Sequence, residues 1–306
     1  MNWRIATPAL VCAMAAMLGG QSGPLFVYTP IDVPGAYWTG PFGISDAAVV
    51  VGYYAAPGQT CGFTWRRGDV AHKSICIENA TYTFAIGINN VGDVVGWYGT
   101  TDGKMHGFLW KNGIPMAIDA PSAACTTADG INDSGRIVGA FRASCPPMSP
   151  AGTGLNGYVL FQGAFEQITV PGAVWTFSRG INARGDIVGY YSDASGKTHG
   201  FLLEKDAPSP QVIDFPGAFQ TEATGINDHG EIVGRYKATS DPKAQDWHGF
   251  LRTRFGDYHS VDVDFPGVVY TRARGINNAG QIVGDFQPAT GGRRGFLAEP
   301  VPGRPW

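Results

Sequence analysis

Charged residues are scarce in this chain: they make up 15% of its 306 residues, against roughly 25% in an average globular protein. The formal net charge is −3, and no Lys/Arg run occurs. A nucleic-acid-binding protein needs a basic patch or stripe, so the sequence predicts no nucleic-acid partner. After the first 22 residues no apolar stretch is long enough to span a bilayer, so we expect no membrane span in the mature chain.

Common enzyme motifs are also lacking. Neither Gly-x-Ser-x-Gly nor His-Glu-x-x-His occurs. Residues 195–198 (Ser-Gly-Lys-Thr) mimic the end of a phosphate-binding loop but lack its first glycine and the strand-to-helix setting. The Asn-Asp-x-Gly turns hold too few carboxylates for a calcium loop. We therefore expect no cofactor, and the sequence favours a protein that is not an enzyme.

Cysteine is rare, and no Cys-x-x-Cys pair occurs, so we expect no metal site. Cys12 lies in an N-terminal apolar run, which leaves Cys61, Cys76, Cys125 and Cys145. An even number of cysteines in an exported chain indicates disulfides, and four of them allow three pairings. Two pairs each straddle one predicted turn almost symmetrically, so we expect disulfides Cys61–Cys76 and Cys125–Cys145. Free buried thiols are the alternative.

Residues 1–22 predict a signal peptide. An early arginine precedes the apolar residues 9–18, and Gly20 and Ser22 place small side chains just before the predicted cleavage point. We expect the mature protein, residues 23–306, to be a single domain that is secreted or periplasmic. An uncleaved anchor is the alternative, although the apolar run is short for crossing a bilayer.

What the sequence has in plenty is glycine, 44 residues of it, within a phrase that occurs six times. The consensus is Pro-Gly-Ala, a small-residue segment, Gly-Ile-Asn-x-x-Gly-x-Ile-Val-Gly, a variable loop and Gly-Phe-Leu. A period of 43–50 residues indicates a repeat architecture. Copies one to six are numbered here by the first glycine of Gly-Ile-Asn, namely Gly43, Gly87, Gly130, Gly180, Gly225 and Gly275.

Each copy predicts four short strands, which in the fourth copy are 175–182, 186–191, 199–203 and 212–215. The second strand has no polar alternation, so both of its faces should be buried. Six such copies predict an all-β fold, a six-bladed β-propeller of four-stranded blades. The last copy lacks a fourth strand, and residues 25–33 supply one, so the N-terminal strand should complete the last blade and close the ring. An open β-solenoid is the alternative.

The repeat resembles the bacterial extracellular proteins of the HAF-repeat type, which are named for a His-Ala-Phe motif. The resemblance rests on the Gly-Ile-Asn phrase of copies two to six and on the His-Gly-Phe triplets at His106, His199 and His248. In the other copies the histidine is replaced by Cys61, Asn156 and Arg294. The resemblance covers about residues 25–298 and implies export and a propeller-like shape, without catalytic residues.

Residues that recur in every copy are expected to serve structure. The three histidines should make structural hydrogen bonds, and the aspartates before Pro-Gly should cap turns; these are Asp32, Asp119, Asp214 and Asp264. Candidate site residues are therefore those at which the copies differ.

One candidate site lies along the predicted central channel, which the residues one and three places before the repeat glycine should border. In adjacent copies we expect ion pairs Asp129–Arg179 and Glu222–Arg272, whereas Arg274 has no acidic counterpart there. A cluster of Arg179, Arg272 and Arg274 could bind a carboxylate or phosphate group.

A second candidate site is aromatic. Trp38, Trp175 and Tyr270 follow the proline of their copies by four residues, and Phe219 lies nearby in its own copy. They should open onto the face with the variable loops and could stack on a sugar or peptide. Packing between blades is the alternative.

Together these features predict an exported, monomeric ligand-binding or interaction module whose partner is a glycan or a protein. One alternative is a propeller enzyme acting on glycans, a hydrolase or lyase, for which Asp129 and Glu222 are the channel carboxylates. Another alternative is a structural envelope protein.

Overall fold

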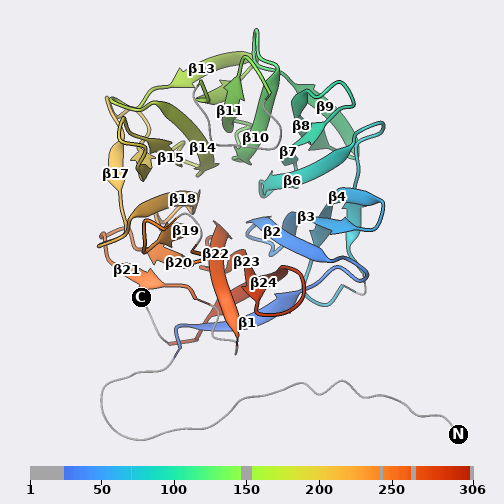
Figure 1. Ribbon diagram of the computed structural model, residues 1–306. Helices are drawn as coiled ribbons and strands as arrows, with labels where there is room; N and C mark the ends of the chain where they lie inside the picture. The colour runs from blue at the N-terminus through green and yellow to red at the C-terminus, as the bar shows by residue number, and fades with distance from the viewer. Residues whose placement is uncertain (1–23, 70, 146–153, 242–243, 263–266, 304–306) are drawn as a thin grey trace, which may run out of the picture.

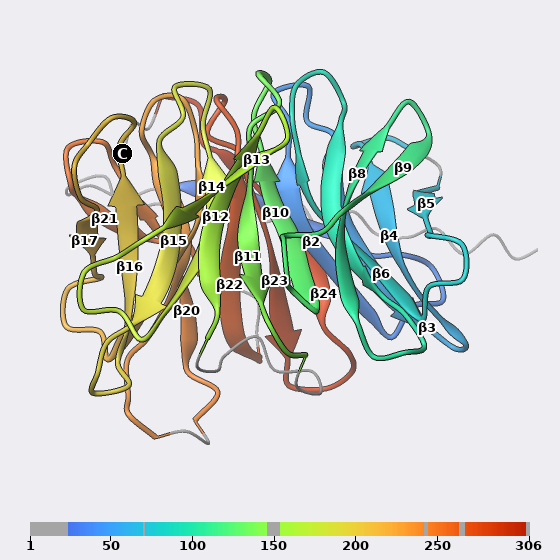
Figure 2. The same ribbon diagram turned by 90° about the horizontal axis from the view of Figure 1, so that it is seen from above.

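The structure, a computed structural model, describes residues 24–69, 71–145, 154–241, 244–262 and 267–303. The predicted signal peptide and Asp264 lie outside these ranges. Within them all regular secondary structure is β-strand, and no helix is present that could cross a bilayer. The sheets stand in a ring around a common axis, which is the arrangement of a β-propeller (Figure 1, Figure 2).

Each copy supplies an inner, a second, a third and an outer strand, counted from the axis outward (Figure 1). The inner strands are β2 (Trp38–Ile44), β6 (Tyr82–Ile88), β10 (Cys125–Ile131), β14 (Trp175–Ile181), β18 (Gln220–Ile226) and β22 (Val268–Ile276). The second strands are β3 (Val50–Ala56), β7 (Val94–Gly99), β11 (Ile137–Arg142), β15 (Ile187–Ser192), β19 (Ile232–Lys237) and β23 (Ile282–Pro288). The third strands are β4 (Gln59–Trp65), β8 (Met105–Lys111), β12 (Asn156–Phe161), β16 (Thr198–Leu203), β20 (Trp247–Arg252) and β24 (Arg294–Pro300). The outer strands are β5 (Lys73–Ile75), β9 (Ile114–Ile118), β13 (Ala164–Ile168), β17 (Gln211–Ile213), β21 (Tyr258–Ser260) and β1 (Phe26–Ile31).

Hydrogen bonding joins these strands into four four-stranded sheets and one eight-stranded sheet within the described residues. The eight-stranded sheet contains copies two and three, which are linked by the parallel pairing of Cys125 with Met105. The N-terminal strand β1 pairs with β24 from Phe26↔Pro300 to Ile31↔Gly295. The first strand thus completes the sheet of the last copy, as the complementary ends of the sequence predict.

The repeat glycine lets the inner strands meet at the axis. A Cβ atom on Gly87 would lie 2.7 Å from the carbonyl oxygen of Asp129, and one on Gly130 would lie 2.8 Å from that of Arg179. In all six copies this Cβ would also lie 3.1–3.3 Å from the Cα of the next glycine, and Gly275 meets Gly43 in the same way. Only glycine permits so close an approach of backbones. We call these six residues the glycine ring.

The asparagine of Gly-Ile-Asn has two functions. Its Oδ1 accepts a hydrogen bond from the backbone four residues later, as in Asn89 with Asp93 (2.8 Å), and so caps the turn. Its Nδ2 also donates to the carbonyl of the equivalent residue in the next copy, as in Asn132 with Asn182 (3.0 Å) and Asn277 with Ser45 (3.0 Å). The same side chain therefore closes its own turn and ties neighbouring copies together.

A second polar ring follows one residue later and consists of Asp46, Asn90, Asp133, Ala183, Asp228 and Asn278. Asn90 Nδ2 donates to the carboxylates of both Asp46 (3.0 Å) and Asp133 (3.2 Å). Asn278 bridges Asp46 and Asp228 in the same manner, at 2.8 Å to each. Ala183 donates its backbone N–H to Oδ1 of Asp228 (2.7 Å) but has no side-chain amide with which to bridge Asp133 and Asp228, so the ring of side chains is interrupted at this position.

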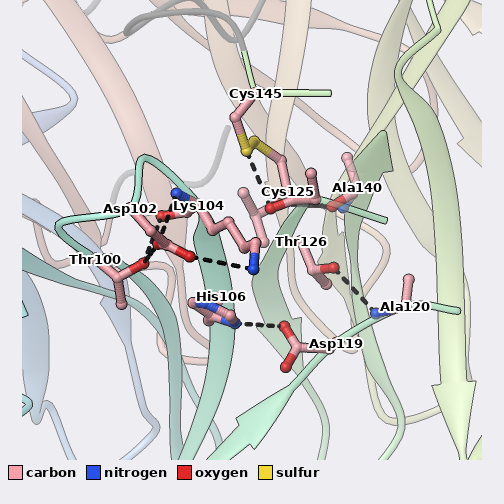
Figure 3. The surroundings of a disulfide bond; sticks show 12 residues. Thr100, Asp102, Lys104, His106, Asp119, Ala120, Cys125, Thr126, Ala140 and Cys145 are labelled. Atoms are coloured by element: carbon pink, nitrogen blue, oxygen red, sulfur yellow. Dashed lines mark hydrogen bonds and ion pairs between the residues drawn. A yellow bond between two sulfur atoms is a disulfide. The ribbon is translucent and has the colours of Figure 1, made fainter. Parts of the chain in front are cut away.

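The third and outer strands are joined at one recurring position. The histidines bond carboxylates there, as Figure 3 shows for His106 and Asp119. The linked residues are Cys61–Cys76, His106–Asp119, His199–Asp214, His248–Asp262 and Arg294–Asp32. In the third copy Asn156 instead accepts from Gln167, which lies two residues before the equivalent position. The prediction of turn capping by these aspartates is wrong for Asp32, Asp119 and Asp214, because the residue opposite on the third strand bonds their carboxylates. In the fifth copy, His248 bonds the carboxylate of Asp262.

Both predicted disulfides are confirmed. Cys61 and Cys76 join β4 to the residue after β5, one place beyond the pair Gly62↔Ile75. Cys125 on β10 joins Cys145, which follows β11 (Figure 3). Each bond spans one hairpin, as the symmetric spacing around the turns predicts.

The interruption at Ala183 predicts that Ala183→Asn stabilises the protein. The new amide would bridge Asp133 and Asp228 as Asn90 bridges its own neighbours. We expect the free energy of unfolding in urea to rise by about 1 kcal/mol, the net value of a typical hydrogen bond. The matched control, Asn90→Ala, should lower it by a similar amount; a loss of stability in both variants would contradict the bridging role.

The His248–Asp262 bond predicts a pH-dependent contribution to stability. Hydrogen bonding to Asp262 raises the pKa of His248 despite its partial burial. When the pKa of a histidine is higher in the folded state, its stabilisation is complete at a pH below the pKa of the unfolded state, which is about 6.5. The stabilisation is lost as the pH rises through the pKa of the folded state. The melting temperature of His248→Gln should therefore fall below that of the wild type at about pH 5.5 and approach it at about pH 8.5. Asp262→Asn should remove this pH dependence, and an equal deficit at both pH values would argue against it.

Candidate functional site

The inner and third strands begin at one face of the ring, where the second and outer strands end (Figure 2). This face, called the loop face here, carries the connections from second to third strands. The longest of these in sequence join β11 to β12 and β19 to β20, and each contains residues outside the described ranges. The glycine ring lies further along the inner strands, toward the opposite face.

The inner strands border a central channel, with a cavity of about 70 Å³ at the level of the glycine ring. The residue before each repeat glycine lines it, namely Phe42, Ile86, Asp129, Arg179, Thr224 and Arg274. The residues one place before the repeat glycine therefore border the channel as predicted, whereas those three places before it are not among the residues that line this cavity. The repeat is strict at the glycine and variable immediately before it.

Two residues nearer the loop face, a second variable position pairs directly with a residue on the second strand. The pairs are Gly40↔Tyr53, Phe84↔Trp97, Thr127↔Ala140, Phe177↔Tyr190, Glu222↔Arg235 and Arg272↔Asp285. Copies two and four thus place two rings there, and copies five and six place an acid and an arginine. At this position, copies one, two and four therefore carry aromatic rings, and copies five and six carry charges.

The predicted ion pair between Asp129 and Arg179 is confirmed. Asp129 is only 3% exposed and also accepts a hydrogen bond from the hydroxyl of Thr127. Burial raises the pKa of Asp129, and the neighbouring charge of Arg179 opposes that shift. This pair joins the inner strands β10 and β14 of adjacent copies.

The predicted pair of Glu222 with Arg272 is wrong. Glu222 accepts from Arg235 on β19 of the same copy, at 2.8 Å from Nε and 2.6 Å from Nη2. Arg272 instead donates from Nε and Nη2 to Oδ2 of Asp285, with Nε at 2.9 Å. Both true partners lie opposite on the neighbouring strand, 13 residues along the chain. A comparison restricted to equivalent inner-strand positions overlooks them.

Arg274 has no acidic counterpart at the compared positions of adjacent copies, but it has an acidic partner within its own copy, because Asp285 serves two arginines. Arg274 Nε donates to Oδ1 of Asp285 at 3.0 Å. Burial alone would raise the pKa of Asp285, but Arg272 and Arg274 lower it to about 2. Burial lowers the pKa of Arg274 to about 9; Asp285 opposes this shift, and the nearby arginines, including Arg179, add to it. The carboxylate between them is therefore shared.

The predicted aromatic residues differ in their exposure. Trp38 and Trp175 are half-buried at the loop face, and Phe219 is 38% exposed. Tyr270, in contrast, is only 5% exposed, so the prediction that it opens onto the face is wrong. The guanidinium carbon of Arg272 lies 4.7 Å from the centroid of its ring, which explains why it is covered.

Sequence reasoning missed two arginines that stack on tryptophans at the loop face. The guanidinium carbon of Arg293 lies 4.4 Å from the ring centroid of Trp38, and that of Arg235 lies 4.3 Å from Trp247. The indole Nε1 of Trp38 is buried without a hydrogen-bond partner. Arg293 directly precedes the third strand β24, and Trp247 begins the third strand β20. The comparison of the copies covered inner-strand positions and therefore did not include these residues.

The remaining chemistry of the site is limited. The two candidate carboxylates of a glycosidase, Asp129 and Glu222, are each bound by an arginine. Among the described residues no group of three or more His, Cys, Asp and Glu side chains is arranged to hold a metal ion. What the arrangement offers is an aromatic and arginine-rich surface for binding.

The shared carboxylate predicts that Asp285→Asn is strongly destabilising, because it leaves two buried guanidinium groups without a counter-charge. Breaking a buried ion pair by removing one partner costs about 3–5 kcal/mol. We expect a loss of this size in urea unfolding. Asp102→Asn, which removes an exposed partner of Lys104, is the control and should cost far less. Equal losses of stability in Asp285→Asn and Asp102→Asn would contradict the role of Asp285 as a shared buried counter-ion.

No protein-family model and no curated protein matches the sequence. The fold does match solved structures. A lectin from Aleuria aurantia in complex with Fucα1-6GlcNAc aligns with a TM-score of 0.54 at 13% identity, over 89% of this chain and 95% of the lectin. A putative TolB from Agrobacterium tumefaciens aligns at 0.53 and 14% identity, over 85% and 90% of the two chains. A gluconolactonase from Xanthomonas campestris aligns at 0.51 and 12% identity, over 87% and 89%. Identities this low show a shared fold alone.

Proposed function

We propose that this protein is an exported glycan-binding module built as a six-bladed propeller, with its ligand site on the loop face at the mouth of the channel. The observation that carries the proposal is the meeting of aromatic rings and arginines in the layer where the copies differ. Rings give sugars flat apolar surfaces, and arginine supplies several hydrogen-bond donors at once. The two disulfides fit an oxidising compartment outside the cytoplasm, and the predicted signal peptide and the HAF-type repeat agree with export.

Three features support six blades. The glycine contacts pass through all six copies and return from Gly275 to Gly43. The eight-stranded sheet consists of two four-stranded sets joined by the pairing of Met105 with Cys125 alone. The fungal lectin that this fold resembles is described as a six-bladed β-propeller with a novel mode of fucose recognition. A propeller of six repeats suits both the length of the chain and its period.

The placement of the aromatic residues supports a sugar as the ligand class. Trp38, Trp175 and Trp247 all lie at strand starts on the loop face, and each remains partly exposed. Phe219 adds an exposed ring beside β18. Binding sites commonly form where variable loops are held by a rigid scaffold. An enzymatic function is less well supported, because the arginines engage both channel carboxylates.

The proposal predicts that a glycan array of the mature protein gives hits that are lost in a Trp175→Ala, Trp247→Ala double variant. Each truncation removes a ring on which a sugar could stack, and hot-spot truncations of this kind cost about 2 kcal/mol or more, roughly 30-fold in affinity. The measurement is array binding followed by calorimetry on the best hit.

Phe255→Ala is the matched control. Phe255 is an exposed ring, at 79%, but it lies in the turn between β20 and β21 on the opposite face. It should leave binding unchanged. Absence of any hit with the wild type, or equal loss in the control and the double variant, would refute the site on the loop face.

A further inference from the structure

Two guanidinium groups from different copies face one phenyl ring inside the channel. The guanidinium carbon of Arg274 lies 4.7 Å from the ring centroid of Phe42, and that of Arg179 lies 5.8 Å from it. All three residues line the cavity of about 70 Å³, whereas about 10–15 Å³ is enough to hold one water. A small polar group therefore fits between the two arginines.

The charges of the channel wall do not balance. The described wall holds three carboxylates, Asp129, Glu222 and Asp285, against four arginines, Arg179, Arg235, Arg272 and Arg274. Arg272 takes one oxygen of Asp285 with two nitrogens, which leaves Arg274 only the Nε contact to the other oxygen. One buried positive charge thus remains uncompensated.

A buried charge is costly unless it is fully paired, and Arg274, which is only 9% exposed, shares its acidic partner Asp285 with Arg272. The lowered pKa of its guanidinium reflects this cost, since burial and three neighbouring arginines all disfavour its charge. The hydroxyl of Tyr53 offers no compensation, because burial raises its pKa and it stays neutral at ordinary pH. An anion that enters the cavity would supply the missing counter-charge.

We propose that the pocket formed by Phe42, Arg179 and Arg274 binds the carboxylate of a ligand. A planar carboxylate matches the fork of a guanidinium group and can accept from two arginines at once. The identity of the ligand rests on the proposed glycan-binding function: if the protein binds glycans, the carboxylate belongs to an acidic sugar, such as a uronic acid residue.

A row of packed rings extends from the loop face toward this pocket. Trp38 packs against Tyr53 with ring centroids 4.9 Å apart, and Tyr53 stacks on Phe42 at 5.3 Å. Arg293 covers the outer end of this row by stacking on Trp38. A sugar ring held near Trp38 can therefore direct its carboxylate along an aromatic wall toward Arg274.

The test is calorimetric titration of the wild-type mature protein with glucuronate, glucose, acetate and inorganic phosphate at constant ionic strength. We expect glucuronate to bind, acetate to bind more weakly and to compete with it, and glucose to bind far more weakly than glucuronate. Phosphate that binds as tightly as glucuronate would show a general anion site and would overturn the assignment to a carboxylate. The assignment would also be overturned if neither glucuronate nor acetate binds.

The decisive variant is Arg274→Gln. It should weaken glucuronate binding about 10- to 100-fold, the value of a charge-assisted hydrogen bond. It should leave the melting temperature unchanged or raise it, because Arg272 keeps Asp285 and the uncompensated charge is gone. A clear fall in melting temperature would indicate a structural arginine and would contradict the proposal. Arg274→Lys, which keeps the charge without the planar fork, should show intermediate binding.

Arg254→Gln is the control for net charge. Arg254 stacks on Phe255 in the turn between β20 and β21, on the opposite face, and its loss should not change glucuronate binding. Neutral glycans that bind the loop face regardless of Arg274 would refute the carboxylate pocket and leave the glycan-binding function standing. Binding of glucuronate and acetate that depends on Arg274, without any hit on the glycan array, would support the carboxylate pocket and refute the glycan-binding function.

Discussion

The contact between successive glycines around the axis is the constraint on which the rest of the molecule depends. Each Gly-Ile-Asn glycine leaves no room for a side chain between its own strand and the carbonyl group of the next, so the inner strands close into a narrow ring. Sheets held so close at the axis must fan outward, and the buried second strands fill the space between them. The asparagine of the same phrase adds a hydrogen bond between copies, which fixes the ring in register. Closure through β1 and β24 then removes the free sheet edge.

The glycine ring also marks the boundary between the repeated residues that hold the fold together and the variable residues of the candidate site. Directly below the glycine ring, isoleucine recurs in all six copies and asparagine in five, since each asparagine must reach its neighbour. Immediately above it, the side chains of the inner strands turn into the channel or toward the next sheet, and the copies diverge. Buried charge occurs in this layer, around Asp285 and its two arginines. Charge of this kind adds little to stability compared with apolar packing, which is why a binding function explains it better than folding does.

Much of the fold could be predicted from the sequence. The fixed period, the all-apolar second strands and the complementary termini predict the strands of the fourth copy and the pairing of β1 with β24. The disulfides follow from the position of each cysteine around a turn. The site was less accessible, because its contacts run between strands that a comparison of equivalent positions does not relate. Asp285 was overlooked for this reason, and the coverage of Tyr270 by Arg272 depends on side-chain packing that no periodicity encodes.

We infer that the ligand enters at the variable layer above the glycine ring. A crystal structure of the mature protein with glucuronate would test this inference. We expect a carboxylate in the channel at about 2.7–2.9 Å from guanidinium nitrogens of Arg179 and Arg274, with the sugar ring near Trp38. Glucuronate bound elsewhere, with only water between those arginines, would contradict it.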